Sequence, residues 1–407
     1  MEITMNVQKT LLICVILMVL GRKLREWFPF LVKYSIPSSV AGGLTFAIIN
    51  LVLSLTGTAQ FMFDSTMQDF FMYVFFTCAG FQASFALLKQ GGIKIIIFLG
   101  LAALLAFLQN VVAVGLSIPL GVEPMIGLMT GSIPMTGGHG NAASFGPIAV
   151  DMGYTNALNV AVAAATFGLV SGSLLGGPFA DGLIKKKNLW NPNMKDSSDD
   201  LDLAEGDSGV RPVSLKVFTT ATILVFIGLG MGSYIKDFFD FVLPSSVNIP
   251  VHVMGMVGGC ILTNIIPMFS KKKQDAIPQV EIDVMGDISL ELFVTMAIMS
   301  MKLWELAQLA LPLIILLIAQ VILIIIFVRY ITFPLMGKDY DSAVISAGHI
   351  GFGLGAVPVS MANMKVVSDK YSYSKLAFFI VPIIGGMFSN FTNAAIITLF
   401  MNIADKM

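Results

Sequence analysis

Two glycine-rich stretches decide how this chain is expected to fold: TGGHGNAASFG (136–146) and AGHIGFGLGAVP (347–358). Each contains one of the three histidines, and each lies between long apolar segments. Glycine disfavours a continuous helix. Non-helical backbone at membrane depth is tolerated only where it is buried in protein or lines a wet cavity. We therefore expect the two stretches to be helix interruptions that serve a binding site.

The composition is that of a membrane protein with several crossings. Of the 407 residues, 56% are hydrophobic and 12% are charged, against about 25% charged in soluble domains. A hydrocarbon core takes roughly 20 apolar residues to cross. Ten apolar windows qualify, at about 5–21, 36–57, 68–88, 93–119, 156–183, 215–235, 248–269, 285–304, 308–331 and 372–400. The net charge of −1 says nothing about nucleic acid, and we expect no such partner.

Two further windows, 123–153 and 339–368, contain the glycine-rich stretches and are too broken to cross as single helices. Positive charge orients the crossings, because Lys and Arg collect on the cytoplasmic side. If the loop after the first window is cytoplasmic, that side holds all 24 Lys and Arg residues except Lys9, Lys236, Lys302 and Lys406. The pattern predicts ten crossings with both termini outside. The broken windows would be re-entrant hairpins, the first entering from outside and the second from the cytoplasm.

The polar segment 185–214 is expected to be a cytoplasmic linker between two transmembrane repeats, 1–184 and 215–407. Each half has five crossings and one hairpin, so the second half is inverted. IPSSVAGG at 36 is similar to IPVHVMGM at 249, and Gln109 and Gln320 lie within corresponding segments. Inverted repeats with interrupted helices are typical of secondary transporters. The predicted fold is an all-α polytopic membrane protein with two inverted repeats of five transmembrane helices plus one re-entrant glycine-rich hairpin each.

At these positions the chain resembles the bacterial sodium:glutamate symporters, over nearly its whole length. The segments that carry the resemblance are GRKL at 21, IPSSVAGG at 36, FFTCAGFQAS at 75, LQN at 108, GLMTGSIPMTGGHG at 127, ATFGLVSGSLLGGP at 165, MKLWELAQLALP at 301, MGKDYDSAV at 336 and AGHIGFGLGAVPVSMANM at 347. The resemblance implies an elevator-type carrier that takes up L-glutamate with Na⁺ as coupling ion and without an organic cofactor. It also implies a homodimer in the lipid bilayer of the bacterial cytoplasmic (inner) membrane.

The chain departs from the expected family pattern at two places. Where GGHGTGAAW is expected, residues 137–145 read GGHGNAASF. Where GNVSLS is expected, residues 286–291 read GDISLE. We expect the first departure to affect selectivity for the side chain of the substrate, through Asn141, Ser144 and Phe145. We expect the second to affect the number of coupled ions or the involvement of protons, through Asp287 and Glu291.

The substrate carboxylates are expected to meet backbone N–H groups, because the arginine nearest to the interior of an apolar window is Arg329, at the end of window 308–331. The glycines would expose that backbone, and nearby polar side chains would add hydrogen bonds. The predicted substrate-binding set is Ser132, Thr136, Gly137, Gly138, His139, Gly140, Asn141, Ser144, Gly348, His349, Gly351, Gly353 and Gly355. The alternatives are that the glycines only let two hairpin tips pack closely, and that the histidines hold protons or form structural hydrogen bonds.

Sodium prefers hard oxygen ligands, and the apolar segments contain several amide, hydroxyl and carboxylate oxygens. The predicted sodium candidates are Asn110, Asp287, Glu291, Ser360, Asn363, Asn390 and Asn393. Asparagine pairs also join helices without an ion, which is the alternative for the last two.

Other functions remain open from the sequence. A sodium- or proton-coupled carrier of hydroxy- or dicarboxylates with the same fold would show the same breaks, and a channel could line a pore with them. An intramembrane enzyme is not expected, because the spans contain no HExxH, GxSxG or paired catalytic aspartate motif.

Overall fold

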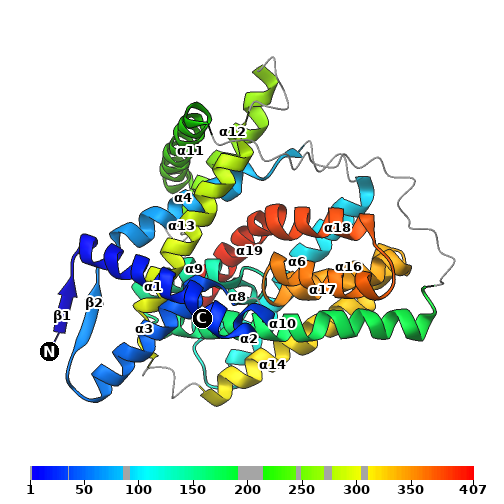
Figure 1. Cartoon of the computed structure of the whole chain (residues 1–407), viewed down its shortest axis with the longest axis horizontal. Coiled ribbons are helices and arrows are strands. Elements are labelled where there is room, and N and C mark those ends of the chain that lie inside the picture. The colour runs from blue at the N-terminus through cyan, green and yellow to red at the C-terminus, as the bar shows by residue number, and fades with distance from the viewer. Residues whose placement is uncertain are drawn as a thin grey trace.

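The structure is a computed structural model that describes residues 2–34, 36–85, 92–190, 214–243, 249–269, 277–303 and 310–407. It is almost entirely helical (Figure 1). The one addition in the described part is a parallel pair of strands, β1 (Glu2–Met5) and β2 (Gln60–Phe63). The aromatic residues of β2 suit a half-buried strand, and Phe61 packs on Phe46 with ring centroids 5.5 Å apart. A strand at the N-terminus was not expected from the apolar pattern.

One set of helices, the peripheral group, draws on both halves of the sequence. Its members are α1 (Val7–Trp27), α2 (Pro29–Lys33), α3 (Ser38–Leu55), α4 (Thr66–Phe81), α11 (Leu215–Val242), α12 (Val251–Phe269) and α13 (Gln279–Met299). Glycines bring their backbones together. A Cβ atom at Gly21 of α1 would lie 2.0 Å from the carbonyl oxygen of Ser38, and one at Gly232 of α11 would lie 2.5 Å from the Cα of Gly255. Small residues at such crossings are how membrane helices pack.

The central group contains the other helices. They are α6 (Gly92–Ser117), α7 (Pro124–Leu128), α8 (Ser132–Met135), α9 (Gly138–Asp151), α10 (Ala157–Lys187), α14 (Ala310–Phe327), η3 (Val328–Thr332), α15 (Phe333–Met336), α16 (Tyr340–Leu354), α17 (Val357–Lys370), α18 (Lys375–Pro382), η4 (Ile383–Phe388) and α19 (Ser389–Ala404). The elements η3 and η4 are π-helical turns inside longer helices. Helix α10 packs against α9, α16 and α17 and so joins the two glycine-rich regions.

Both glycine-rich windows are broken helices, as the sequence indicated. The first forms α7, α8 and α9, with the break before α9 at Thr136 and Gly137. The second forms α16 and α17, which are separated by Gly355 and Ala356. Asp339 begins α16 with a capping box, since its carboxylate accepts the Ser342 N–H at 2.8 Å. Each window therefore has a tip, which we call tip 1 (Thr136–Gly140) and tip 2 (Gly355–Pro358).

Seven helices in the described part are long and apolar enough to cross a membrane. They lie at Ser38–Leu55, Gly92–Ser117, Ala157–Lys187, Leu215–Val242, Val251–Phe269, Leu311–Met336 and Lys375–Ala404. Three of the ten expected windows form helices that are too short or too charged to count as candidate spans. Helix α4 has only 16 residues, while α1 contains basic residues near its end and α13 contains several carboxylates. The molecule is thus polytopic, and its described residues contain seven candidate spans by length and hydropathy.

The expected linker is described only at its start. Helix α10 continues through Lys185–Lys187, and Asn188 ends it with a left-handed φ of 49°. Residues 191–213 lie outside the described residues.

Candidate functional site

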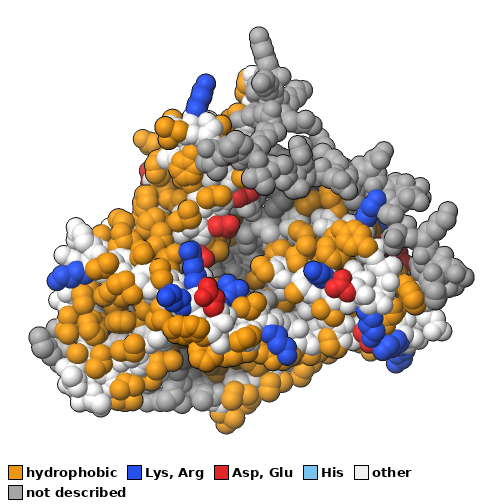
Figure 2. Space-filling model, viewed as in Figure 1, with side chains coloured by type: hydrophobic (Ala, Val, Ile, Leu, Met, Phe, Trp, Pro, Cys, Tyr) orange, Lys and Arg blue, Asp and Glu red, His pale blue; other side chains and the backbone are white. Residues whose placement is uncertain are grey.

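A cavity of about 540 Å³ lies between the peripheral and central groups, within the range of roughly 300–1,000 Å³ typical of small-molecule sites. Tip 1 and tip 2 form one side of it together with Gly385, Gly386 and Asn390. Helices α4 and α13 form the opposite side, and α13 contributes Asp283, Asp287 and Glu291. Figure 2 shows charged side chains gathered near the junction of the two groups, on a surface that is otherwise mostly hydrophobic. The cavity thus has glycine backbone on one wall and carboxylates on the other.

The two tips touch each other. Gly138 has a φ of +60°, and a Cβ atom there would lie 2.7 Å from the carbonyl oxygen of Gly355. Only glycine meets both demands, because other residues are strained at this φ and would also collide with the carbonyl. Helix α9 begins at Gly138 and α17 begins at Val357. The first N–H groups of a helix have no acceptor within it, so the start of α9 offers free donors and partial positive charge to the cavity. The start of α17 offers fewer donors, because Pro358 has no N–H and the N–H of Val359 donates to the Ala356 carbonyl at 3.0 Å, which leaves the N–H of Val357.

One buried glutamine connects tip 1 to the end of α16, just before tip 2. The Thr136 hydroxyl donates to Oε1 of Gln109 at 2.7 Å, and Nε2 of Gln109 donates to the carbonyl of Gly353 at 2.7 Å. Gln109 itself is fully buried in α6. The sequence marked Gln109 as a repeat position and not as a site residue. Its position next to Asn110 in the LQN segment was the available signal.

About half of the expected substrate residues lie at the cavity. Thr136, Gly137, Gly138, His139, Gly140 and Gly355 line it. Ser132, Asn141 and Ser144 are buried and are not part of its lining. Gly348, His349, Gly351 and Gly353 lie inside α16, away from the lining.

The α16 glycines serve close packing. A Cβ atom at Gly351 would lie 2.5 Å from the Cα of Ser360 in α17, and one at Gly353 would lie 2.7 Å from the side chain of Ile324. This geometry agrees with the alternative that some of the glycines let helices approach closely. The sequence could not separate these positions from Gly138, because both windows are rich in glycine.

Each motif histidine has a threonine partner. His139 Nε2 lies 3.0 Å from the hydroxyl of Thr166 in α10, and His349 Nδ1 lies 3.0 Å from the hydroxyl of Thr332. The His349 ring also stacks on Phe352 with centroids 5.0 Å apart. His139 reaches the cavity, whereas His349 is enclosed by aromatic rings. These contacts favour a hydrogen-bonded packing role for His349.

Comparisons with known proteins show which family the sequence matches. Residues 3–373 match the family model described as sodium/glutamate symporter. The chain is 37% identical over 393 residues to the sodium/glutamate symporter of Escherichia coli (strain K12), with 96% of each chain covered. It is 36% identical over 399 residues to that of Haemophilus influenzae (strain ATCC 51907 / DSM 11121 / KW20 / Rd), with 98% of this chain and 97% of the relative covered. The chain belongs to the sodium/glutamate symporter family. It is therefore a multi-pass membrane transporter and not an enzyme.

In this symporter-family chain, the expected sodium candidates fall into three places. Asp287, Glu291 and Asn390 line the cavity. Ser360 donates to the carbonyl of Gly348 at 2.7 Å and so joins α17 to α16, and Asn363 donates to that of Gly172 at 3.0 Å and so joins α17 to α10. Asn110 and Asn393 meet at Ser132, outside the cavity lining.

An arginine lies closer to the cavity than the sequence indicated. The guanidinium of Arg22 in α1 is 2.8 Å from the carboxylate of Glu291, which also accepts the Ser38 hydroxyl at 3.2 Å. The Arg22 side chain is 62% exposed. Glu291 is thus held on the peripheral side by two partners.

Several cavity residues were missed by the sequence analysis. Asp283 precedes Asp287 by one helical turn on α13, and Gln82 donates to it at 3.0 Å. Gly385 and Gly386 lie in the π-helical turn η4. The four-residue spacing of the carboxylates was a usable signal for Asp283, whereas the π turn has no clear sequence pattern.

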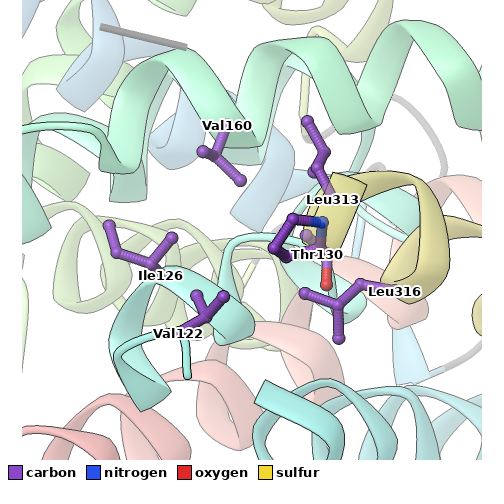
Figure 3. A pocket seen from close by; sticks show the side chains of 7 residues that line it. Val122, Ile126, Thr130, Val160, Leu313 and Leu316 are labelled. Carbon is purple, nitrogen blue, oxygen red and sulfur yellow. The ribbon is translucent and has the colours of Figure 1, made fainter. Parts of the chain in front are cut away.

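A second, much smaller cavity of about 10 Å³ lies beside α7, α10 and α14 (Figure 3). Its walls are apolar apart from Thr130, whose hydroxyl donates to the Gly127 carbonyl at 2.8 Å. Of these two cavities, only the large one has charged side chains in its walls.

Proposed function

We propose that this chain is a symporter that carries L-glutamate into the bacterial cell across the cytoplasmic membrane, driven by Na⁺. The substrate would bind in the cavity between the tips and α13. The observation that carries the proposal is the meeting of tip 1 and tip 2, which come from opposite halves of the sequence and line one cavity. Membership of the family supports the transported species.

The geometry suits a substrate with two carboxylates. The start of α9 and the start of α17 both reach the cavity. The first turn of α9 presents N–H groups that have no acceptor within the helix, and α17 presents that of Val357. One carboxylate can bind at each helix start without an arginine in contact. The Thr136 hydroxyl adds a side chain whose orientation is fixed by Gln109. The carboxylates of Asp287 and Glu291 on the facing wall can attract the α-ammonium group or a cation.

An elevator mechanism with alternating access is part of the proposal. The peripheral group would be the static scaffold and dimer-forming part, and the central group would carry the tips across the membrane. The order of elements supports two inverted repeats, because α1, α3, α4, α6, a broken window and α10 in the first half are followed by α11, α12, α13, α14, a second broken window and α18–α19. The crossings of Gly21 with Gly42 and of Gly232 with Gly255 occupy equivalent places in this order. Ten crossings, re-entrant hairpins and external termini belong to the same proposal.

Transport assays in proteoliposomes test the function directly. Radiolabelled L-glutamate uptake is measured with an inward Na⁺ gradient, with an inward proton gradient at equal Na⁺, and with neither. Accumulation that requires the Na⁺ gradient and is competed by unlabelled glutamate, but not by citrate or malate, is expected. Accumulation driven by protons alone, or stronger competition by citrate or malate, would instead indicate the carboxylate carrier. Flux that does not saturate would indicate a channel.

A further inference from the structure

Three buried polar side chains converge at the start of α8, away from the substrate cavity. Asn110 of α6 accepts the backbone N–H of Ser132 through Oδ1 at 2.7 Å. Asn393 of α19 donates from Nδ2 to the carbonyl of Ser132 at 3.0 Å. All three residues are at most 1% exposed. A helix from the first half of the chain and one from its end thus meet at one break in the first window.

Each of the three side chains has one polar atom without a hydrogen-bond partner among the described residues. These atoms are Nδ2 of Asn110, Oγ of Ser132 and Oδ1 of Asn393. Buried polar atoms are nearly always paired, so a group of unpaired ones calls for an explanation. Nearby Thr130 behaves differently, because its buried hydroxyl donates to the Gly127 carbonyl at 2.8 Å. A buried hydroxyl beside this break can therefore find a partner, whereas that of Ser132 has none among the described residues.

The backbone at the break adds to the oxygen-rich character of the cluster. The carbonyl of Thr130 receives no hydrogen bond within the described residues, because the residue four positions later is Pro134, which has no N–H. A Cβ atom at Gly131 would lie 2.4 Å from Oδ1 of Asn110. Glycine at that position is therefore what allows the asparagine to reach the broken backbone.

We infer that Ser132 and Asn393 form a binding site for one Na⁺ ion at the break held by Asn110, with Oγ of Ser132 and Oδ1 of Asn393 as side-chain ligands. Both are neutral hard oxygens, the ligand type that small alkali and alkaline-earth cations take. Broken helices near the centre of a membrane also bind Na⁺ through such groups. The inference rests on the proposed function, since it assigns a place to the coupling ion.

The same cluster offers a route by which the ion affects the substrate. The carbonyl of Ser132 accepts the N–H groups of Thr136 at 3.2 Å and of Gly137 at 3.1 Å, and both of these residues line the cavity. An ion that fixes Ser132 against Asn393 would also fix the turn that forms tip 1. Sodium would then raise the affinity for glutamate, and glutamate would raise the affinity for sodium by the same factor.

Sodium-dependent thermal stabilisation of the purified full-length protein, without glutamate, tests the site apart from transport. NaCl replaces choline chloride at constant ionic strength. Ser132→Ala removes one proposed ligand, Ser132→Thr keeps a hydroxyl, and Thr130→Ala is the matched control. Ser132→Ala should raise the half-maximal Na⁺ concentration by about tenfold, the effect of losing one interaction with a charged group. Ser132→Thr and Thr130→Ala should stay close to the wild type.

Unchanged Na⁺ dependence in Ser132→Ala, or an equal shift in Thr130→Ala, would overturn the inference. If Ser132→Ala gives little folded protein, Asn393→Ala removes the other proposed ligand and is measured in the same way. Failure of the site is distinct from failure of the function. A wild type that accumulates glutamate without a Na⁺ gradient contradicts the proposed function, whereas Na⁺-driven uptake with normal Na⁺ dependence in Ser132→Ala contradicts only the site.

Discussion

The side-chain amide of Gln320 donates a 2.9 Å hydrogen bond to the backbone carbonyl of Gln109. Both residues are fully buried, and the bond joins α14 to α6. The side chain of Gln109 in turn binds Thr136 at tip 1 and Gly353 just before tip 2. One residue of α6, supported from α14, therefore sets the position of both tips.

Gln109→Leu should weaken glutamate binding more than it weakens folding. The change leaves the Thr136 hydroxyl and the Gly353 carbonyl without their partner, and each unpaired buried group costs about 1–3 kcal/mol. The tips would lose their common position, so the KM for glutamate in Na⁺-driven uptake should rise about tenfold or more. Thr136→Val, which breaks only one of the two bonds, should have a smaller effect. Equal KM values for wild type and Gln109→Leu would show that the tips do not depend on this residue.

Gly138→Ala should abolish uptake while the protein still reaches the membrane. A methyl group would lie 2.7 Å from the Gly355 carbonyl, and the φ of +60° adds strain of about 1–2 kcal/mol. Gly100→Ala in α6 is the matched control, because a Cβ atom there meets nothing within 4 Å. Uptake and membrane abundance are measured together for both variants. Normal transport by Gly138→Ala would rule out the close contact between the tips.

Gly232→Ala should destabilise the peripheral group, whereas Gly230→Ala two positions away should not. A Cβ atom at Gly232 would lie 2.5 Å from the backbone of Gly255, but one at Gly230 has no neighbour within 4 Å. The first change must push α11 and α12 apart, and overpacking of this kind costs about 1–3 kcal/mol. Thermal unfolding of the purified proteins is the measurement. A similar melting temperature for both variants would contradict the close helix crossing.

Removing the ion pair between Arg22 and Glu291 should change stability little. The two side chains are 62% and 34% exposed, and solvent-exposed pairs contribute about 0–1 kcal/mol. Arg22→Ala should therefore lower the free energy of unfolding by less than about 1 kcal/mol, with a smaller difference at high salt. The difference in free energy of unfolding is measured by denaturant unfolding of both proteins at low and high NaCl. The same measurement in choline chloride shows whether specific Na⁺ binding contributes. A large loss at high salt would mean that Glu291 is left buried and unpaired.

Much of the architecture followed from the sequence because local chemistry dictates it. Apolar runs form helices that bury their backbone hydrogen bonds. The glycine- and proline-rich windows break because those residues cannot maintain a helix at 136–137 and 355–356. The same features marked the two tips as the place of binding, and six of the expected substrate residues line the cavity. The short N-terminal strand escaped prediction, since its partner β2 lies far along the chain.

Only the tertiary structure decided which polar residues act together. Gly138 and Gly353 look equivalent in the sequence, but one touches the opposite tip and the other packs against Ile324. Asn110 and Asn393 are 283 positions apart by their numbers in the chain, and they become neighbours through Ser132 because α6 packs against α19. The sequence by itself determines which donors, acceptors and side-chain sizes each position offers. Tertiary packing decides which partner each donor or acceptor meets, because a hydrogen bond forms only when the two atoms lie within about 3 Å.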